Sequence, residues 1–253
     1  MSRPSFLRTA AATLVVLAAC AAHAEGHAPH WVYKGSHGDP AHWGALDPAF
    51  EACAKGQTQS PIDISKTVKT DLPALTFAYA SSMPTLVNNG HTIQVNLPSG
   101  SSLKIGDQSY ELLQFHFHTP SEETVTGKHA AMVAHFVHRN RAGELAVIGV
   151  LMEQGKKQNA AFAGIFEHLP RPGEKIMVDE LTLDLAALLP TDKHYYAYEG
   201  SLTTPPCSQG VHWMVLKTPV MMGAEQIKAF RRLFSANARP IQPLNGRIVK
   251  ESL

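Results

Sequence analysis

Three histidines in one part of the chain have the spacing of a metal site. His116 and His118 are separated by one residue within the run QFHFH. Side chains of a β-strand alternate between faces, so both imidazoles project from one face, together with Gln114. A turn signal and a second apolar run, residues 132–137, follow, and this run can bring His135 beside the first two. Three neutral imidazoles on a rigid sheet suit Zn²⁺ with its fourth position open, which is the arrangement of a catalytic site.

Two neighbouring histidines compete with this set, and a structural role competes with metal binding. A buried histidine is usually a hydrogen-bonded core residue, and a lone His-x-His pair is a weak metal signal. His138 lies three positions after His135 and therefore faces the other side of its strand, while His129 falls in the turn. We expect both to be structural or solvated. Strand parity leaves His116, His118 and His135 as the set that can act together.

Composition limits the class of protein. The chain has 253 residues, of which 44% are hydrophobic and 17% charged, and its formal net charge is +1. This length and apolar content predict one large domain with a substantial core. A nearly neutral chain gives no electrostatic reason to bind nucleic acid or an anionic membrane.

The N-terminus has the pattern of a signal peptide. Arg3 and Arg8 precede an apolar run, residues 9–22, that is too short to span a bilayer. Small residues then offer a cleavage site, so we expect residues 1–24 to be the signal peptide and residues 25–253 the mature domain.

The leader also leaves a second possibility open, because LAAC at residues 17–20 resembles a lipoprotein box in which Cys20 is lipidated. The mature protein would then be anchored to a membrane rather than soluble in the periplasm. Either form lies in an oxidising compartment, where Cys53 and Cys207 are expected to form a disulfide that closes a long loop. The alternative is two buried free thiols.

The apolar patterns predict a mainly β (α+β) protein. Short β-type runs alternate with turns through most of the chain, whereas helical spacing is confined to residues 160–168 and 224–234. Residues 145–152 are continuously apolar and predict a strand that is buried on both faces. The residues before position 49 predict an irregular segment. Further strands are expected at residues 61–64, 75–79, 92–96, 102–105, 110–117, 132–137 and 211–216.

Seven stretches together resemble the alpha-class carbonic anhydrases, of the bacterial, secreted type, over residues 31–253. They occur in the order and at the spacings of that family. The resemblance implies a single domain with a central twisted, mostly antiparallel sheet of about ten strands and short peripheral helices. The stretches are GQTQSPIDI at residues 56–64, NNGH at 88–91, QFHFHTPSE at 114–122, AHFVH at 134–138, LAVIGV at 145–150, GSLTTPPC at 200–207 and ARPIQPLN at 238–245.

The same resemblance implies roles for single residues. It implies that the three histidines bind Zn²⁺, that Thr203 accepts a hydrogen bond from zinc-bound hydroxide and donates to Glu122, and that His91 passes a proton to solvent. Gln114 and Thr204 would line the polar side of the site. The apolar pocket for carbon dioxide would consist of Val137, Val147, Leu202 and Trp213, and the disulfide Cys53–Cys207 would match that of secreted members.

Two positions depart from the family pattern. The family usually has Glu two residues before the third zinc histidine, where this chain has Val133, and His after the conserved Glu, where this chain has Glu123. We expect Glu123 to take over the missing acceptor, with a carboxylate oxygen about 2.7–2.9 Å from the outer nitrogen of His135. The alternative is that Glu123 faces solvent and a backbone carbonyl orients the imidazole.

The sequence therefore predicts a zinc lyase that reversibly hydrates carbon dioxide to bicarbonate and a proton. A hydrolase of activated esters would need the same residues and remains open as a side activity. A third hypothesis is a binding module without catalysis. The presence of all three histidines argues against it. The expected partner is the small-molecule substrate, with no nucleic acid and with a membrane only if Cys20 is lipidated. Secreted bacterial relatives are often dimers, so a monomer and a homodimer both stay open.

Overall fold

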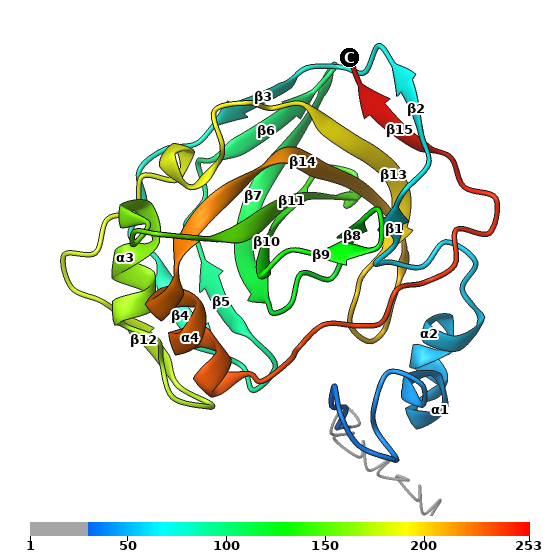
Figure 1. The fold of residues 1–253 in the computed structure, drawn as a ribbon, viewed down its shortest axis with the longest axis horizontal. Coiled ribbons are helices and arrows are strands. Elements are labelled where there is room, and N and C mark those ends of the chain that lie inside the picture. The colour runs from blue at the N-terminus through cyan, green and yellow to red at the C-terminus, as the bar shows by residue number, and fades with distance from the viewer. Residues whose placement is uncertain (1–29) are drawn as a thin grey trace, which may run out of the picture.

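The computed structural model describes residues 30–253. The expected signal peptide (residues 1–24), the start of the mature chain at Glu25 and the alternative lipidation at Cys20 all lie outside these residues. Figure 1 shows one large twisted sheet, with the helices at its periphery and the strands that carry the histidine motifs near its centre. The predicted mainly β fold is confirmed.

The large sheet has twelve strands within the described part of the chain. Ten follow the order β12-β4-β5-β7-β10-β11-β14-β13-β15-β2, while β6 also pairs with β7 and β3 pairs with β6. Neighbouring strands in this sheet are antiparallel, except for the parallel pairs β11–β14 and β15–β2. A small second sheet joins β1, β8 and β9. About ten strands were expected, and short strands without a clear pattern of their own account for the difference.

The described chain contains the following elements. The strands of the large sheet are β2 (Thr67–Thr70), β3 (Leu75–Ala78), β4 (Thr85–Asn88), β5 (Ile93–Asn96), β6 (Ser102–Ile105), β7 (Gln108–His118), β10 (Met132–Arg139), β11 (Leu145–Gly155), β12 (Lys175–Met177), β13 (Tyr195–Ser201), β14 (Gln209–Gly223) and β15 (Val249–Ser252). The others are β1 (Asp63–Ile64), β8 (Thr124–Val125), β9 (Lys128–His129), α1 (Trp43–Leu46), α2 (Ala52–Lys55), α3 (Ala160–Glu167), α4 (Ala224–Leu233) and the 3₁₀ turns Pro48–Phe50 and Ala186–Leu188.

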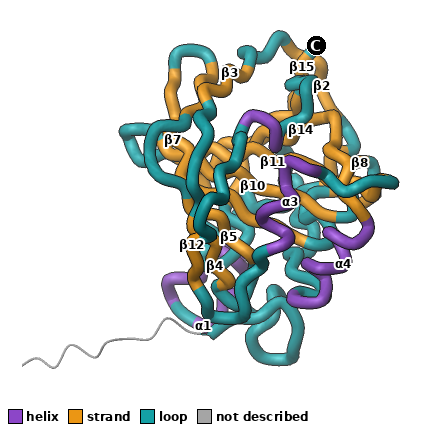
Figure 2. The backbone as a smooth tube through the Cα atoms, turned by 90° about the vertical axis from the view of Figure 1, so that its left-hand side faces the viewer, coloured by secondary structure: helices purple, strands orange, loops and turns teal. Residues whose placement is uncertain are grey.

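The central strands are buried on both faces. One face, with Phe115, Phe117 and Phe136, packs against a large apolar core that includes residues of α3 and α4. The two helices contact each other and lie together beside the strands in Figure 2. The opposite face carries the histidines and a smaller apolar cluster. Residues 146–152 of β11 are all buried, as its continuous apolar run predicts.

The N-terminal segment covers one end of this second face. This segment was expected to be irregular, and most of it is. The short helices are the exception, and α1 forms around Trp43, which is fully buried. Its core also contains the Cys53–Cys207 disulfide, which is confirmed and joins residues 154 positions apart. Within residues 30–253, no helix has the length and apolar character needed to cross a membrane.

Candidate metal and catalytic site

Strand register places two of the histidines in one row across the sheet. His116 on β7 is directly opposite His135 on β10. The row continues to Gln94 on β5 and, on the other side, to Gly149 on β11 and Val215 on β14. His118 lies two positions after His116 on the same strand, opposite Val133, so its imidazole faces the same way. The strand alternation predicted from the sequence therefore accounts for the observed placement of the three histidines on one face.

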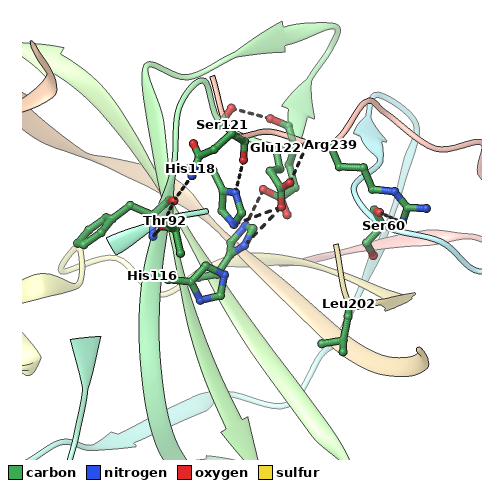
Figure 3. A network of polar contacts seen from close by, with 12 residues as sticks. Ser60, Thr92, His116, His118, Ser121, Glu122, Leu202 and Arg239 are labelled. Atoms are coloured by element: carbon green, nitrogen blue, oxygen red, sulfur yellow. Dashed lines mark hydrogen bonds and ion pairs between the residues drawn. The ribbon is translucent and has the colours of Figure 1, made fainter. Parts of the chain in front are cut away.

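Each histidine has one nitrogen engaged by an outer acceptor, which leaves its other nitrogen directed to a common centre. The acceptors fix the tautomers, since a carbonyl or carboxylate oxygen requires an N–H donor. Figure 3 shows this convergence at the strand ends. The outer contacts are His116 Nδ1 to Gln114 Oε1 at 2.9 Å, His118 Nδ1 to the carbonyl of Asn237 at 2.7 Å, and His135 Nε2 to Glu123 Oε2 at 3.2 Å.

The three inner nitrogens fit a metal ion. One ligand atom from each histidine lies within 4.8 Å of the others. The inner Nε2 of His118 is buried and has no hydrogen-bond partner in the described chain. Burial lowers the pKa of His116 to about 3 and that of His118 well below its usual value, so both present a neutral lone pair. Three histidine nitrogens, as in this group, are a ligand set of catalytic zinc sites.

A buried glutamate lies beside these nitrogens. Glu122 is fully buried, and its Oε2 is 3.5 Å from His118 Nε2 and 3.8 Å from His135 Nδ1. Its Oε1 accepts a 2.8 Å hydrogen bond from the backbone N–H of Arg239. Burial raises the pKa of Glu122 to about 7, against the lowering effect of His135 and of the nearby Thr203 hydroxyl. Thr203 lies beside the carboxylate, although the two form no hydrogen bond of ordinary geometry.

Arg239 ties this region to the N-terminal segment. Its side chain is buried and donates 2.8 Å hydrogen bonds to the side-chain oxygen of Gln59 and the carbonyl of Ser60. It also donates to the carbonyl of Cys53 at 3.0 Å. Figure 3 shows its backbone on Glu122 and its guanidinium near Ser60. One residue thus fixes Glu122 and one end of the disulfide.

A second row runs parallel to the histidines and changes from polar to apolar. Asn96 pairs with Gln114, Gln114 with Val137, Val137 with Val147, and Val147 with Trp213, one residue from each of five strands. The three apolar members belong to one cluster, against which Leu202 also packs. The structure therefore brings the four expected pocket residues together. Thr204 is half-buried in the loop after β13, two positions beyond Leu202.

His91 is held at the edge of the site, in the turn between β4 and β5. The side chain of Asn89 accepts a hydrogen bond from its backbone N–H, and the amide of Asn237 donates to its carbonyl. Its ring stacks on Trp31, with 3.6 Å between centroids and 8° between planes. Burial and the charge of His30 lower the pKa of His91. The indole therefore covers one face of the imidazole ring.

The two histidines set aside by parity lie apart from this site. His138 is fully buried, and its Nε2 is 2.6 Å from the Tyr79 hydroxyl, beside Phe136 of the other core. His129 is exposed and its Nδ1 donates to the carbonyl of Ser121.

Sequence reasoning missed three contributors. The alternation of Gln94 and Asn96 with Ile93 and Val95 could have revealed the polar row. Trp31 comes from a segment without a pattern, so nothing local indicated its stack on His91.

The third is Tyr198, whose ring lies parallel to that of Trp213 with 5.9 Å between centroids. Its hydroxyl is buried without a partner among the described residues. This pairing follows from the register of β13 on β14, which no local pattern reveals.

Fold and site together define a mainly β protein with a built three-histidine metal site. The chain belongs to the carbonic anhydrases, since the family model for eukaryotic-type carbonic anhydrase matches residues 38–253. It is 42% identical to a carbonic anhydrase of Pectobacterium atrosepticum over 93% of this chain and 96% of that protein. It is 43% identical to a carbonic anhydrase of Neisseria gonorrhoeae over 98% of this chain and all of the other. The alpha-carbonic anhydrase of Thermovibrio ammonificans in complex with sulfanilamide superposes with a TM-score of 0.85, at 44% identity, over 88% of this chain and 100% of that one.

Proposed function

We propose that this carbonic anhydrase binds zinc and reversibly hydrates carbon dioxide to bicarbonate and a proton. The observation that carries the proposal is the convergence of three imidazole nitrogens, each imidazole fixed by an acceptor at its other nitrogen. Three nitrogen ligands favour Zn²⁺ over the hard cations, which prefer oxygen. When bound there, zinc lowers the pKa of water to about 7, the value known for carbonic anhydrase itself, and so supplies hydroxide at neutral pH.

Glu122 and Thr203 orient the attacking oxygen. The free Oε2 of Glu122 is an acceptor beside the Thr203 hydroxyl. If the hydroxyl donates to this carboxylate, its lone pairs are left to accept from the attacking oxygen and fix the direction of attack. The Arg239 amide holds the carboxylate in place through its other oxygen.

The apolar end of the second row suits the substrate. Carbon dioxide is small and apolar, so its site requires surface without hydrogen-bond donors more than it requires polar contacts. Val137, Val147, Trp213 and Leu202 provide this surface, while Gln114 and Thr204 provide polar groups nearer to bicarbonate.

The proton produced by each turnover must leave the site. Imidazole is the side chain whose pKa suits transfer near neutral pH, and His91 is half-exposed at the edge of the site. We assign it the relay to bulk solvent.

Metal analysis and a carbon dioxide hydration assay on the purified full chain test this function. We expect one zinc per chain, and we expect His116→Ala, His118→Ala and His135→Ala each to remove most metal and activity. Full zinc and full rate in any of the three would refute the ligand set. Metal without hydration but with ester cleavage would favour the hydrolase, and neither metal nor turnover would favour a binding module.

We further propose export to the periplasm, which the disulfide supports because such bonds persist in oxidising compartments. Mass spectrometry of the protein from its host should find a chain that begins near Glu25. A diacylated Cys20 would instead establish the membrane-anchored form. Light scattering of the same sample separates monomer from homodimer.

A further inference from the structure

The acceptor of His135 comes from an unexpected place in the chain. Glu123 is fully buried, and its Oε2 contacts the Nε2 of His135 at 3.2 Å. This distance is longer than the expected 2.7–2.9 Å but within the range of an N–H···O hydrogen bond. The alternative, a solvent-facing Glu123 with a backbone carbonyl on His135, does not occur.

Local hydrogen bonds direct Glu123 inward. The Ser121 hydroxyl donates to the Glu123 carbonyl at 2.7 Å and accepts from the backbone N–H of Ala130 at 2.9 Å. The next residue, Thr124, begins β8, which pairs with β1. The backbone is thus fixed on both sides of Glu123, so its side chain reaches His135 without a mobile loop. Figure 3 shows Ser121 in this position above the histidines.

Val133 cannot supply the contact. It lies two positions before His135 on the same face of β10 and is fully buried. It packs in the apolar cluster with Ile62, Ile64 and Tyr198. An apolar side chain fills this position, so the carboxylate that serves His135 has to come from the neighbouring segment.

A contribution to folding stability does not explain why a carboxylate is buried at position 123. A buried charge is costly unless it is paired and hydrogen-bonded. Within residues 30–253, His135 is the only basic side chain within ion-pair distance of Glu123. No Lys or Arg of the described chain neutralises it, so its position is best explained by its effect on the imidazole.

One buried acceptor and one buried donor are left unpaired on this side of the sheet. Glu123 Oε1 and the Tyr198 hydroxyl are both buried and both lack a hydrogen-bond partner in the described chain. The Tyr198 ring lies parallel to that of Trp213, whose ring centroid is 4.8 Å from that of His135. After burial itself, the nearby Glu123 is the next cause that raises the pKa of Tyr198. One unpaired acceptor and one unpaired donor in the same apolar surroundings satisfy each other at the least cost.

We propose that Glu123 is the positioning residue of the third histidine, in place of a carboxylate at position 133, and that the Tyr198 hydroxyl anchors its free oxygen. The carboxylate draws on the Nε2 proton of His135 and so strengthens Nδ1 as a metal ligand. Tyr198 acts through Glu123 and touches neither metal nor substrate. This inference rests on the proposed zinc site.

Zinc release to a chelator, measured on the zinc-loaded full chain, tests both parts. We expect Glu123→Gln to release zinc about 10–100-fold faster than wild type, as loss of an outer partner typically does. Tyr198→Phe should also release zinc faster than wild type, but by a smaller factor. The double variant should release zinc no faster than Glu123→Gln alone, because Tyr198 acts only through the carboxylate.

Tyr195→Phe is the matched control. Tyr195 lies on the same strand, and its hydroxyl donates to the carbonyl of Pro73 on the far side of the sheet. Its loss should lower the melting temperature but leave the rate of zinc release unchanged.

A relocated carboxylate provides the rescue. Val133→Glu combined with Glu123→His should return zinc release to within a few-fold of wild type. Val133→Glu alone should not help, since two carboxylates would repel each other and compete for one N–H. This rescue also distinguishes positioning from folding if Glu123→Gln is unstable.

Each contrary result has one meaning. Release from Glu123→Gln at the wild-type rate overturns the assignment of Glu123. If the rate increases of Glu123→Gln and Tyr198→Phe multiply in the double variant, the anchoring by Tyr198 is overturned. A wild-type chain that binds no zinc overturns the proposed function itself and is seen before any variant is compared.

Discussion

The imidazole of His91 lies flat on the indole of Trp31, with ring centroids 3.6 Å apart. Position 91 was expected from the sequence to carry a proton relay, whereas the contact with Trp31 joins it to a segment 60 positions earlier. The stack removes solvent from one face of the imidazole and restricts its rotation. The proton relay that we propose for His91 should therefore depend on the N-terminal segment as well as on the sheet.

His91→Ala should slow hydration in weakly buffered solution and leave zinc content unchanged. The reason is that another group must then carry the proton out of the site. Added imidazole should restore part of the rate, as measured by stopped-flow hydration at low and high buffer concentration. An unaltered rate at low buffer would show that protons leave by another route.

Trp31→Ala should raise the pKa of His91 towards its ordinary value. Burial lowers this pKa in the native protein, and removal of the indole exposes the ring. The direction follows because water stabilises the charged imidazolium. NMR titration of the His91 ring protons measures the change, and a pKa that stays constant or falls would contradict it.

His138 should make the protein less stable as the pH falls from about 6.5 to about 4. Burial lowers its pKa to about 4, so the unfolded chain takes up a proton before the native one does. The stability that neutral His138 confers is complete above pH 6.5 and is lost as the pH approaches 4, an effect on the order of 3 kcal/mol. Urea unfolding at several pH values should therefore show a shallower decline for His138→Gln. Equal slopes for both proteins would exclude the effect.

Replacing Cys53 and Cys207 by Ser should lower the free energy of unfolding by about 2–4 kcal/mol, because the bond closes a long loop. Reducing agent should lower the wild-type value similarly and leave the double variant unaffected. Denaturant titration with and without reductant measures both. A wild-type value that reductant does not change, with the bond shown to be reduced, would contradict the expectation.

Val147→Phe should lower kcat/KM for carbon dioxide at least about tenfold, equivalent to about 1.4 kcal/mol, because the ring occupies the apolar pocket. Zinc content should stay constant. The control is Ile148→Val on the same strand, which removes a methyl group from the opposite core and should affect stability alone. Comparable activity losses in both variants would place the effect in the core instead of the pocket.

The histidine row was predictable because it depends on strand parity, which the sequence displays. The disulfide followed from two cysteines in a chain with the pattern of a signal peptide, and the long strands from their apolar runs. β13 was not recognised, since a strand whose tyrosines follow no alternation and that has a Gly near its end shows no clear β pattern. β2 and β12 are short and partly exposed, and their pairing rather than their composition makes them strands.

Contacts between residues far apart in the chain could not be predicted from local sequence patterns. The Arg239 amide on Glu122 joins residues 117 positions apart, and neither residue's neighbours indicate it. Glu123 was identified only because the chain departs from its family at two positions, which made the missing acceptor visible. Its partner Tyr198 follows from three-dimensional packing, which no single segment encodes.

The second row, from Asn96 to Trp213, also bears on how this protein can evolve. Each member comes from a different strand, and the backbone there is held by hydrogen bonds that do not depend on the side chain. A single codon change can therefore alter the polarity of the cleft at one place and leave the neighbouring histidine row in register. Selectivity for substrates and inhibitors can drift among descendants of this chain while the metal-binding geometry is inherited intact.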